Sequence, residues 1–323
     1  MLELTGHTFA PNASLQDAAG RTFRKLRLSL TEACQFQCFY CMPHPSQAVI
    51  QPGFLDADGY ASIVRGLVPC GLRSVRLTGG EPTLRPDFAE IVLALGAIPG
   101  IDLSLTSNGH LLPRHFPTLL QAGVRSVNIS LDSLDPATFR AITGRDLAPV
   151  VDAIRGARAH GLAVKLNCVA LRGLNSSEIP RLLDFASSVG AELRFLELMR
   201  IGAVASHHRD RFFPAEEIEA AIRARGPIRA LTVPPDSTAL RFARYDDSTF
   251  GIIASETRPF CDGCSRLRLT ARGEMRPCLM SEERIPLGHL AGEALREVAR
   301  DAFLRKPLSR QESTSVAMHT LGG

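Results

Sequence analysis

The sequence predicts an α/β protein: a partial TIM-like barrel of six βα units, followed by a smaller α+β domain. Two observations in the first two thirds of the chain support the barrel. Short β-branched runs alternate with helix-like segments, and such alternation implies a parallel sheet. Six units are fewer than a closed βα barrel contains, so the barrel is expected to be partial. The third observation is a change near residue 225, after which short strands joined by turns replace the alternation.

Each predicted strand of the barrel is a short run rich in β-branched or large apolar residues. These runs are residues 25–30, 74–78, 101–106, 126–131, 163–170 and 193–198. Segments with apolar residues at three- and four-residue spacing lie between them, at residues 56–68, 87–98, 148–161 and 177–190. The strands are nearly continuously apolar, as is expected when both faces of a sheet are covered.

The second domain is predicted to span residues 226–323, with residues 1–225 forming the barrel. Gly226 and Pro227 mark the boundary, since this pair favours a turn. Strands are expected within residues 227–233, 239–245, 249–255 and 265–278, with a turn at 272–274 inside the last segment. A helix is expected near residues 292–305.

Composition excludes several classes of protein. The chain of 35.0 kDa is 45% hydrophobic, which is enough to bury a large core. No apolar run reaches the roughly 18 residues of a membrane span, and the first residues lack the order of a signal peptide. We therefore expect a cytoplasmic protein without membrane contact. The formal charge of +4 suits an anionic small molecule, and the absence of Trp argues against nucleic-acid bases stacked on the protein.

Six of the eight cysteines form two groups, and the other two stand alone. In a reducing cytosol, clustered cysteines indicate metal or redox chemistry more often than disulfides. Cys70 and Cys168 stand among apolar residues and are expected to be packed in the core. The two groups are Cys34, Cys38 and Cys41, and Cys261, Cys264 and Cys278.

The first group, CQFQCFYC at residues 34–41, directly follows the first predicted strand. In a βα barrel, the loops at the carboxyl ends of the strands form the active face. Iron–sulfur cubanes normally take four thiolates, so three would leave one iron without a protein ligand. A structural zinc site is the alternative, with His44 as the fourth ligand that such a site requires.

Polar residues also follow the next three predicted strands, where core packing would predict apolar ones. The first stretch is TGGEP at residues 78–82, in which the glycines allow a ligand to approach the backbone. Glu81 can accept hydrogen bonds from an ammonium group, although the stretch also suits an ordinary turn. TSNG at 106–109 and SLDS at 130–133 follow the later strands.

The second cysteine group has the spacing C-x2-C-x13-C and spans a predicted hairpin. Three thiols again leave an open corner on a cubane, which a substrate could occupy. A zinc ribbon that lacks one ligand and a lone electron-transfer cluster are the alternatives. Between the cysteines, Arg266 and Arg268 alternate on one strand and therefore point to the same face. Two guanidiniums beside a metal site suit phosphate, although a solvated strand face would give the same pattern.

The first cysteine group, with Tyr40 before its last cysteine, and the GGEP stretch resemble the radical S-adenosylmethionine superfamily. Within it, the chain is similar over nearly its full length to the GTP 3',8-cyclase family, also called molybdenum cofactor biosynthesis protein A. The matching stretches are residues 17–43, 75–88, 126–135, 142–145, 164–169 and 194–199, the second cysteine group with RLR at 266–268, and the Gly-Gly end.

The resemblance implies a [4Fe-4S] cluster on each cysteine group. The open iron of the first would bind the amino and carboxylate groups of S-adenosylmethionine, and that of the second would hold the guanine base of GTP. S-adenosylmethionine would meet Tyr40, Gly79, Gly80, Glu81, Ser130 and Met199. GTP would meet Arg21, Arg76, Thr106, Lys165, Arg266, Leu267 and Arg268, with Asn108 and Arg194 as further candidates. The terminal residues Gly322 and Gly323 would enter the active site as catalytic residues.

The reaction that the resemblance implies is that of a lyase. One electron cleaves S-adenosylmethionine, and the 5'-deoxyadenosyl radical takes hydrogen from C3' of GTP. The resulting carbon radical attacks C8, and reduction of the cyclised radical by one electron and one proton yields 3',8-cyclo-7,8-dihydro-GTP, an early product of molybdenum cofactor (molybdopterin) biosynthesis. The implied partners are an electron donor such as flavodoxin or ferredoxin and the next enzyme of pyranopterin synthesis, and a homodimer is compatible. A peptide-modifying radical enzyme and a non-enzymatic iron–sulfur electron carrier are the rival interpretations.

Overall fold

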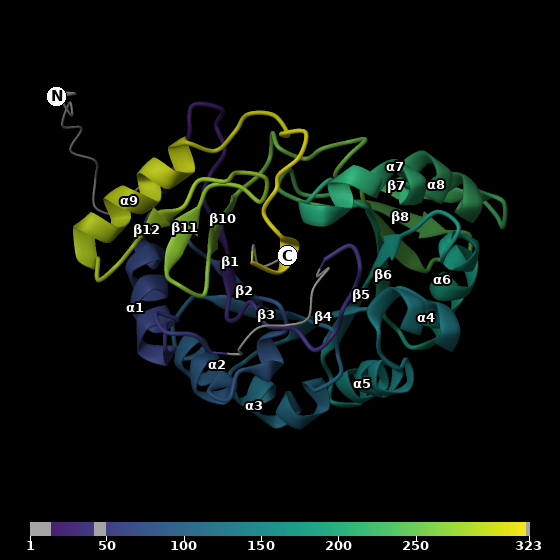
Figure 1. The fold of residues 1–323 in the computed structure, drawn as a ribbon, viewed down its shortest axis with the longest axis horizontal. Helices are drawn as coiled ribbons and strands as arrows, with labels where there is room; N and C mark the ends of the chain where they lie inside the picture. Colours follow the sequence, from purple (N-terminus) through teal and green to yellow (C-terminus); the bar gives the residue numbers. More distant parts are fainter. Residues whose placement is uncertain (1–13, 42–49, 321–323) are drawn as a thin grey trace.

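The computed structural model describes residues 14–41 and 50–320. Its named strands form one curved sheet (Figure 1). Its strand order is β12-β11-β10-β1-β2-β3-β4-β5-β6-β9-β8-β7. The strands predicted for the barrel pair in parallel as its middle part, which confirms the predicted parallel sheet. They are β1 (Lys25–Ser29), β2 (Ser74–Thr78), β3 (Asp102–Ser107), β4 (Ser126–Ser130), β5 (Ala163–Ala170) and β6 (Glu192–Glu197).

Helices cover the outer face of this sheet (Figure 1). Those that were predicted are α1 (Ala57–Leu67), α2 (Phe88–Gly96), α5 (Ala148–Ala159) and α6 (Ile179–Ser188). Those that were not predicted are α3 (Phe116–Gln121), α4 (Pro136–Thr143), α7 (His208–Arg211) and α8 (Ala215–Arg223). Most of these are too short to show a helical period. In α4, local signals define the ends instead: the Asp135 side chain accepts from the Thr138 N–H, and Gly144 ends the helix at φ 70°.

The part of the chain after residue 225 adds strands to both edges of the barrel sheet. Its elements are β7 (Ile228–Leu231), β8 (Leu240–Arg244), β9 (Thr249–Ile253), β10 (Arg266–Leu269), β11 (Glu274–Arg276), β12 (Ile285–Pro286) and α9 (Gly292–Leu304). Strand β10 pairs in parallel with β1, and β9 pairs in parallel with β6. This part therefore extends the barrel sheet and does not form a separate sheet. The predicted turn at 272–274 is confirmed, with Gly273 in the left-handed region at φ 73°.

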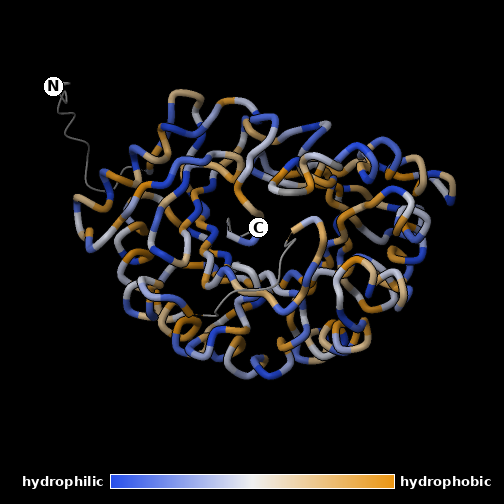
Figure 2. Tube along the Cα trace, in the orientation of Figure 1, coloured by the Kyte–Doolittle hydropathy of each residue, from blue (hydrophilic) through white to orange (hydrophobic). Residues whose placement is uncertain are grey.

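The central strands alternate between apolar and polar residues (Figure 2). Leu26 and Leu28 of β1 and Val75 of β2 are buried in the main hydrophobic cluster. Arg27 and Arg76 lie between such residues and face the inside of the curved sheet, where they line a cavity. The strands are therefore less continuously apolar than the sequence suggested, because their inner face carries polar residues that line a cavity.

The remaining parts of the core agree with the sequence prediction. Cys70 and Cys168 are 3% and 1% exposed and pack among apolar residues. None of the helices in the described part of the chain combines the length and the apolar character that crossing a bilayer requires.

Helix α9 brings the end of the chain back against the start of the barrel. It packs on α1, and the ring of Phe303 lies 5.8 Å from that of Phe23, centroid to centroid. Phe303 is fully buried, whereas its neighbour Leu304 is 53% exposed.

We predict that Phe303→Ala lowers the free energy of unfolding by about 3–5 kcal/mol, since it leaves a cavity between α9 and the barrel. Leu304→Ala, the matched control, should change it by less than about 0.5 kcal/mol. Urea unfolding of the metal-free protein measures both values. Equal effects of the two substitutions would contradict the packing described for α9.

Candidate active site

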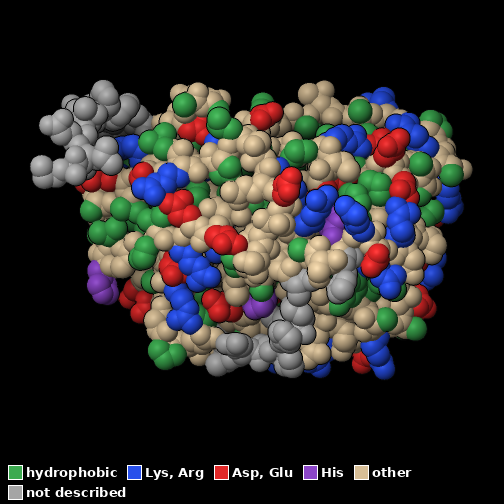
Figure 3. Space-filling view, turned by 45° about the horizontal axis from the view of Figure 1, so that its top comes forward, with side chains coloured by type: hydrophobic (Ala, Val, Ile, Leu, Met, Phe, Trp, Pro, Cys, Tyr) green, Lys and Arg blue, Asp and Glu red, His purple; other side chains and the backbone are tan. Residues whose placement is uncertain are grey.

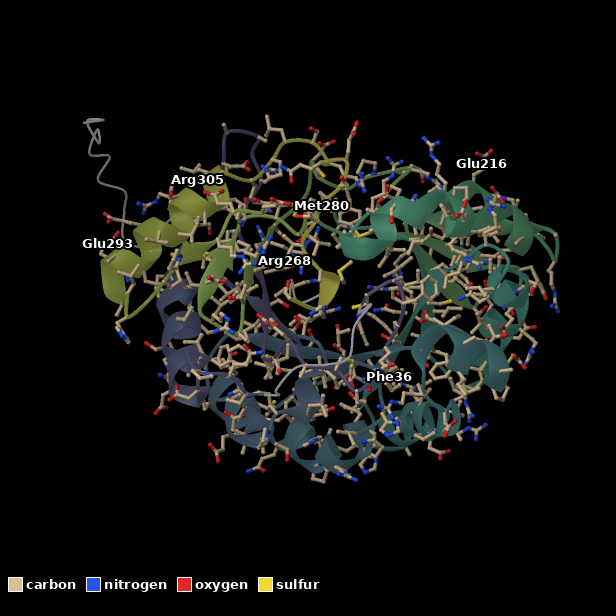
Figure 4. All side chains as sticks on the ribbon, in the orientation of Figure 1. Phe36, Glu216, Arg268, Met280, Glu293 and Arg305 are labelled. Carbon is tan, nitrogen blue, oxygen red and sulfur yellow. The ribbon has the colours of Figure 1, made fainter. Side chains whose placement is uncertain are left out.

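A cavity of about 340 Å³ lies inside the curved sheet, and residues from both cysteine groups line it. Figure 4 shows the side chains that project into the ring, with Arg268 near its centre and Phe36 below. We call the two cysteine groups the first triad (Cys34, Cys38, Cys41) and the second triad (Cys261, Cys264, Cys278). None of these six cysteines forms a disulfide in the described part of the chain.

The register of β1 and β10 places the triads at opposite ends of the cavity. Lys25, the first residue of β1, pairs with Arg266, the first residue of β10, and the two strands are parallel. The first triad follows the carboxyl end of β1, while Cys264 immediately precedes the amino end of β10. Strand β11 is antiparallel to β10, so Cys278 returns to the end where Cys264 lies.

The length of β1 sets the separation between the two ends. At the usual rise of about 3.3 Å per residue, its five residues span about 13 Å. The carboxyl-end rule therefore predicted the place of the first triad. It does not apply to the second triad, which lies at the amino end.

Helix α4 supports the loop of the first triad. Phe36 is 3% exposed and its ring lies 6.1 Å from that of Phe139, edge to face. The N–H of Gln37 donates to the carbonyl of Thr143 at 2.9 Å, and Arg145 donates to the carbonyl of Gln35 at 2.7 Å. These contacts fix the backbone that carries the thiols.

The GGE stretch packs on the backbone that leads into Cys34. The N–H of Gly80 donates to the carbonyl of Thr31, and the N–H of Glu81 to that of Ala33, both at 2.7 Å. A Cβ atom on Gly80 would lie 2.1 Å from the Ala33 oxygen, so only glycine fits there. The glycines therefore serve a close approach of two loops, and the same bare backbone lines the cavity.

Glu81 connects the loops that follow β2 and β3. Its carboxylate accepts from the Thr83 hydroxyl at 2.5 Å, the Ser107 hydroxyl at 2.9 Å and the Asn108 N–H at 2.7 Å. Burial raises the pKa of Glu81, and these hydrogen bonds oppose the shift. The side chain does not line the cavity. The Asn108 amide in turn donates to the sulfur of Cys34 at 3.6 Å, so Glu81 positions a neighbour of the first triad.

Asp132 lies beside the first triad and holds Tyr40. The Tyr40 hydroxyl donates to Asp132 at 2.6 Å, and the N–H of Val169 donates to the same carboxylate at 2.8 Å. Burial raises the pKa of Asp132 to about 6. Sequence reasoning placed Asp132 in the polar SLDS stretch but gave it no role.

The thiols of the two triads differ in acidity. Burial raises the pKa of Cys34 and of Cys41 to about 12, and that of Cys38 well above its ordinary value. Burial also acts on Cys264, but Arg266 and Lys306 outweigh it and lower its pKa to about 7. The second triad therefore lies in a more positive environment than the first.

The second triad is held by backbone contacts and cations. The N–H of Cys264 donates to the carbonyl of Cys261 at 3.1 Å, and Arg266 donates to the Cys264 sulfur at 3.3 Å. Gly263 lies against the chain at Pro235, where a Cβ atom would come within 1.8 Å of the carbonyl oxygen. This close packing explains the glycine between the first two cysteines of the triad.

Positive charge is concentrated between the triads. Burial, followed by the neighbouring guanidiniums of Arg268, Arg76 and Arg266, lowers the pKa of Arg27 well below its ordinary value. Burial and Arg194 lower the pKa of Arg76 to about 10. An anion in the cavity would relieve this crowding, and guanidiniums match phosphate oxygens in geometry.

Most of the predicted site residues meet at this cavity. Its lining includes both triads and Tyr40, Arg76, Gly79, Gly80, Thr106, Asn108, Ser130, Arg194, Met199, Arg266 and Arg268. Lys165 lies on the same face of β5 as the lining residue Asn167 and is half-buried. Leu267 is fully buried and lies on the opposite face of β10. Gly322, Gly323 and the zinc-ligand candidate His44 lie outside the described residues.

The structure gives Arg21 a place different from the predicted one. Its guanidinium is buried, pairs with Asp17 at 2.6 Å and donates to the carbonyls of Cys261, Lys306 and Pro307. It does not line the cavity. Arg27, six residues further along the chain, does line it and was missed, although its alternation with the apolar residues of β1 was a usable signal.

The thiols within each triad lie near one another. In the described ranges, no three His, Cys, Asp or Glu side chains converge on one metal-ion position. The thiols of each triad are nevertheless close enough to raise one another's pKa values. Thiolates are the protein ligands that iron–sulfur clusters use, so the side chains present are of the kind that such a cluster binds.

Comparison with known proteins agrees with this geometry. The Radical SAM superfamily model matches residues 28–186, and the Molybdenum Cofactor Synthesis C model matches residues 191–314. A GTP 3',8-cyclase of Synechocystis sp. is 39% identical over 311 residues, which are 96% of this chain and 95% of that relative. The chain belongs to the GTP 3',8-cyclase family. A second cyclase, of Stenotrophomonas maltophilia, is 40% identical over 313 residues, again 96% of this chain and 95% of the relative.

Solved structures of more distant proteins have a similar fold. The crystal structure of Streptococcus suis SuiB bound to S-adenosylmethionine has a TM-score of 0.63 at 15% identity, covering 89% of this chain and 67% of that chain. This likeness shows the fold alone. Membership of the radical S-adenosylmethionine superfamily implies a [4Fe-4S] cluster and S-adenosylmethionine.

We predict that Cys264 is the fastest of the six triad cysteines to react with iodoacetamide in metal-free protein near neutral pH. With a pKa of about 7 it is partly thiolate there, whereas Cys34 and Cys41, at about 12, stay protonated. Peptide mass spectrometry over time measures the six rates. Unfolded protein is the control, because all six thiols should then react alike. Faster labelling of the first triad in the folded protein would contradict the described electrostatics.

Proposed function

We propose that this chain converts GTP to 3',8-cyclo-7,8-dihydro-GTP by radical S-adenosylmethionine chemistry, an early step of molybdenum cofactor biosynthesis. One observation supports it above all: a single cavity has a thiol triad at each end and crowded arginines between them. In this proposal, S-adenosylmethionine lies toward the first triad and GTP toward the second. The GTP 3',8-cyclase relatives share almost the full length of the chain.

In this proposal, each triad holds one [4Fe-4S] cluster. When bound, the first cluster supplies the radical chemistry by which S-adenosylmethionine removes hydrogen from C3' of GTP. The protein positions S-adenosylmethionine with residues that line the cavity at that end: Tyr40, Gly79, Gly80, Ser130 and Met199. Glu81 acts indirectly, because its carboxylate holds the loops after β2 and β3 in place.

GTP lies across the positive middle of the cavity, with its guanine base toward the second cluster. The triphosphate is bound by Arg76, Arg266 and Arg268, and Arg27 takes the place that the sequence assigned to Arg21. Thr106 and Arg194 line the same space, and Lys165 adds its charge from the same face of β5. A polyanion is the ligand that such a set of partly uncompensated cations binds best.

The end of the chain closes the cavity in this proposal. Met318 lines it, and the Nδ1 atom of His319 lies 3.4 Å from the carbonyl oxygen of Cys41. The last described residues thus reach the middle of the ring (Figure 1). This direction supports the proposal that Gly322 and Gly323 enter the site, where residues without side chains fit beside a bound nucleotide.

We also propose that the protein is cytoplasmic and receives its electrons from a donor such as flavodoxin or ferredoxin. Its product would pass to the next enzyme of pyranopterin synthesis, and a homodimer is compatible with this role. No nucleic acid is expected to bind, and on the face shown in Figure 3 basic and acidic side chains are interspersed.

We predict that anaerobically reconstituted protein transfers deuterium from C3' of labelled GTP into 5'-deoxyadenosine. The cavity is expected to hold C3' beside the first triad, so the label should appear only in the presence of both nucleotides. Mass spectrometry of 5'-deoxyadenosine measures the transfer. S-adenosylmethionine cleavage without label transfer would contradict GTP as the substrate.

We predict that Arg27→Met weakens GTP binding by about 10- to 100-fold, since it removes a charged hydrogen-bond donor from the phosphate site. Arg24→Met is the matched control, because Arg24 is exposed just before β1 and should leave the affinity unchanged. Anaerobic isothermal titration calorimetry with reconstituted protein measures both.

The companion variant Arg21→Met separates the two candidate arginines. It should lower the free energy of unfolding, because three backbone carbonyls lose their donor, and it should weaken GTP binding less than Arg27→Met does. A larger loss of affinity from Arg21→Met than from Arg27→Met would return the phosphate contact to Arg21.

A further inference from the structure

Lys306 lies at the end of helix α9, and its ammonium group enters the wall of the cavity between the two arms of the second triad. It donates to the carbonyl of Arg266 at 2.8 Å and to the carbonyl of Pro277 at 2.7 Å. The first carbonyl belongs to the arm that follows Cys264, and the second directly precedes Cys278. One side chain therefore connects both arms of the triad.

Arg21 holds the backbone of Lys306 in place. Its guanidinium donates to the carbonyl of Lys306 at 3.0 Å and to the carbonyl of Cys261 at 3.2 Å, and it is itself held by Asp17. Through Arg21, the backbone of Lys306 is thus connected to Cys261, the remaining cysteine of the triad. Together, Arg21 and Lys306 connect all three cysteine positions through backbone carbonyls, without using a thiol.

The ammonium of Lys306 is buried next to the thiols and not next to a carboxylate. Its residue is 5% exposed, and its two hydrogen-bond acceptors are neutral. A buried cation in such a place is costly unless a negative group compensates it. Cys264 and Cys278 are the neighbouring groups that can carry such a negative charge.

The choice of lysine at this position is unusual for the chain. Only three of its 37 basic residues are lysines, at positions 25, 165 and 306, and all the others are arginines. A compact ammonium directs its hydrogens along three directions, whereas a planar guanidinium needs more space. Two converging carbonyls and a nearby sulfur are acceptors that suit the three N–H groups of an ammonium.

We propose that Lys306 is a positioning residue for the second iron–sulfur cluster and that its charge raises the reduction potential of that cluster. The inference rests on the proposed second cluster. It names Lys306 as a residue that affects the position and the reduction potential of that cluster. A positive charge beside a cluster favours the reduced form, which carries one more negative charge. Hydrogen bonding by the same residue holds the cysteine arms at the spacing that the cluster needs.

The test uses full-length protein in which Cys34, Cys38 and Cys41 are all replaced by Ala, so that only the second triad can bind a cluster. Lys306→Met removes both the charge and the donors, whereas Lys306→Gln keeps a donor and removes the charge. Arg305→Met is the matched control: it removes the same charge one residue earlier, from a side chain that pairs with Glu283 and Asp301 on the outer rim (Figure 4).

Two quantities are measured after anaerobic reconstitution. The first is iron and sulfide retained against a chelator, which should fall by about 10- to 100-fold in Lys306→Met and by less in Lys306→Gln. The second is the midpoint potential of the cluster from a redox titration followed by electron paramagnetic resonance. It should shift to lower values in both Lys306 variants and stay unchanged in Arg305→Met.

The outcomes separate this inference from the proposed function. A parent protein that retains no iron would contradict the second cluster itself. A parent that retains a cluster, with Lys306→Met equal to it in content and potential, would overturn only the role of Lys306. If both Lys306 variants lose the cluster while their unfolding midpoints match that of the parent, the positioning role is supported. An equal shift of potential in Arg305→Met would overturn the local charge effect.

Discussion

Buried positive charge inside the curved sheet is the constraint on which the rest of this structure depends. Arg27 and Arg268 project from the neighbouring strands β1 and β10, and Arg76 projects from β2 on the other side of β1. Burial and mutual repulsion lower their pKa values, so the folded chain bears an electrostatic cost. An anion with several oxygens relieves that cost by bridging the guanidiniums. The inner face is therefore arranged for a ligand, while the outer face packs on helices.

The pairing of β1 with β10 converts two distant sequence motifs into the two ends of one cavity. The first triad follows β1 and the second surrounds the amino end of β10, so the parallel register sets their separation. Two backbone carbonyls accept hydrogen bonds from the Lys306 ammonium beside the second triad, whereas Arg21 behind it also pairs with Asp17. The charge of Lys306 is therefore available to sulfur and to a nucleotide. Hydrogen bonds to backbone carbonyls thus fix the position of Lys306, while its charge acts on the neighbouring sulfur atoms.

Sequence reasoning found what local patterns determine. The bounds of β2 and β5 were predicted to the residue because β-branched runs end at turns, and the cysteine spacings located both triads. The alternation of Arg27 with apolar residues indicated only that it faces the inside of the sheet; the arginines beside it come from strands that pair over long sequence distances. Arg21 and Glu81 lie in matching motifs, yet their partners depend on how loops meet in space. Lys306 carried no local signal, since its role arises from two carbonyls on another hairpin.

The direct test of the central claim is an anomalous-difference map at the iron edge from crystals grown without oxygen. We expect two compact iron peaks inside the curved sheet, one touching each triad, separated by at least the roughly 13 Å length of β1. S-adenosylmethionine should adjoin the first peak and GTP the second. A single iron peak, or a second peak completed by a fourth protein ligand, would contradict this account.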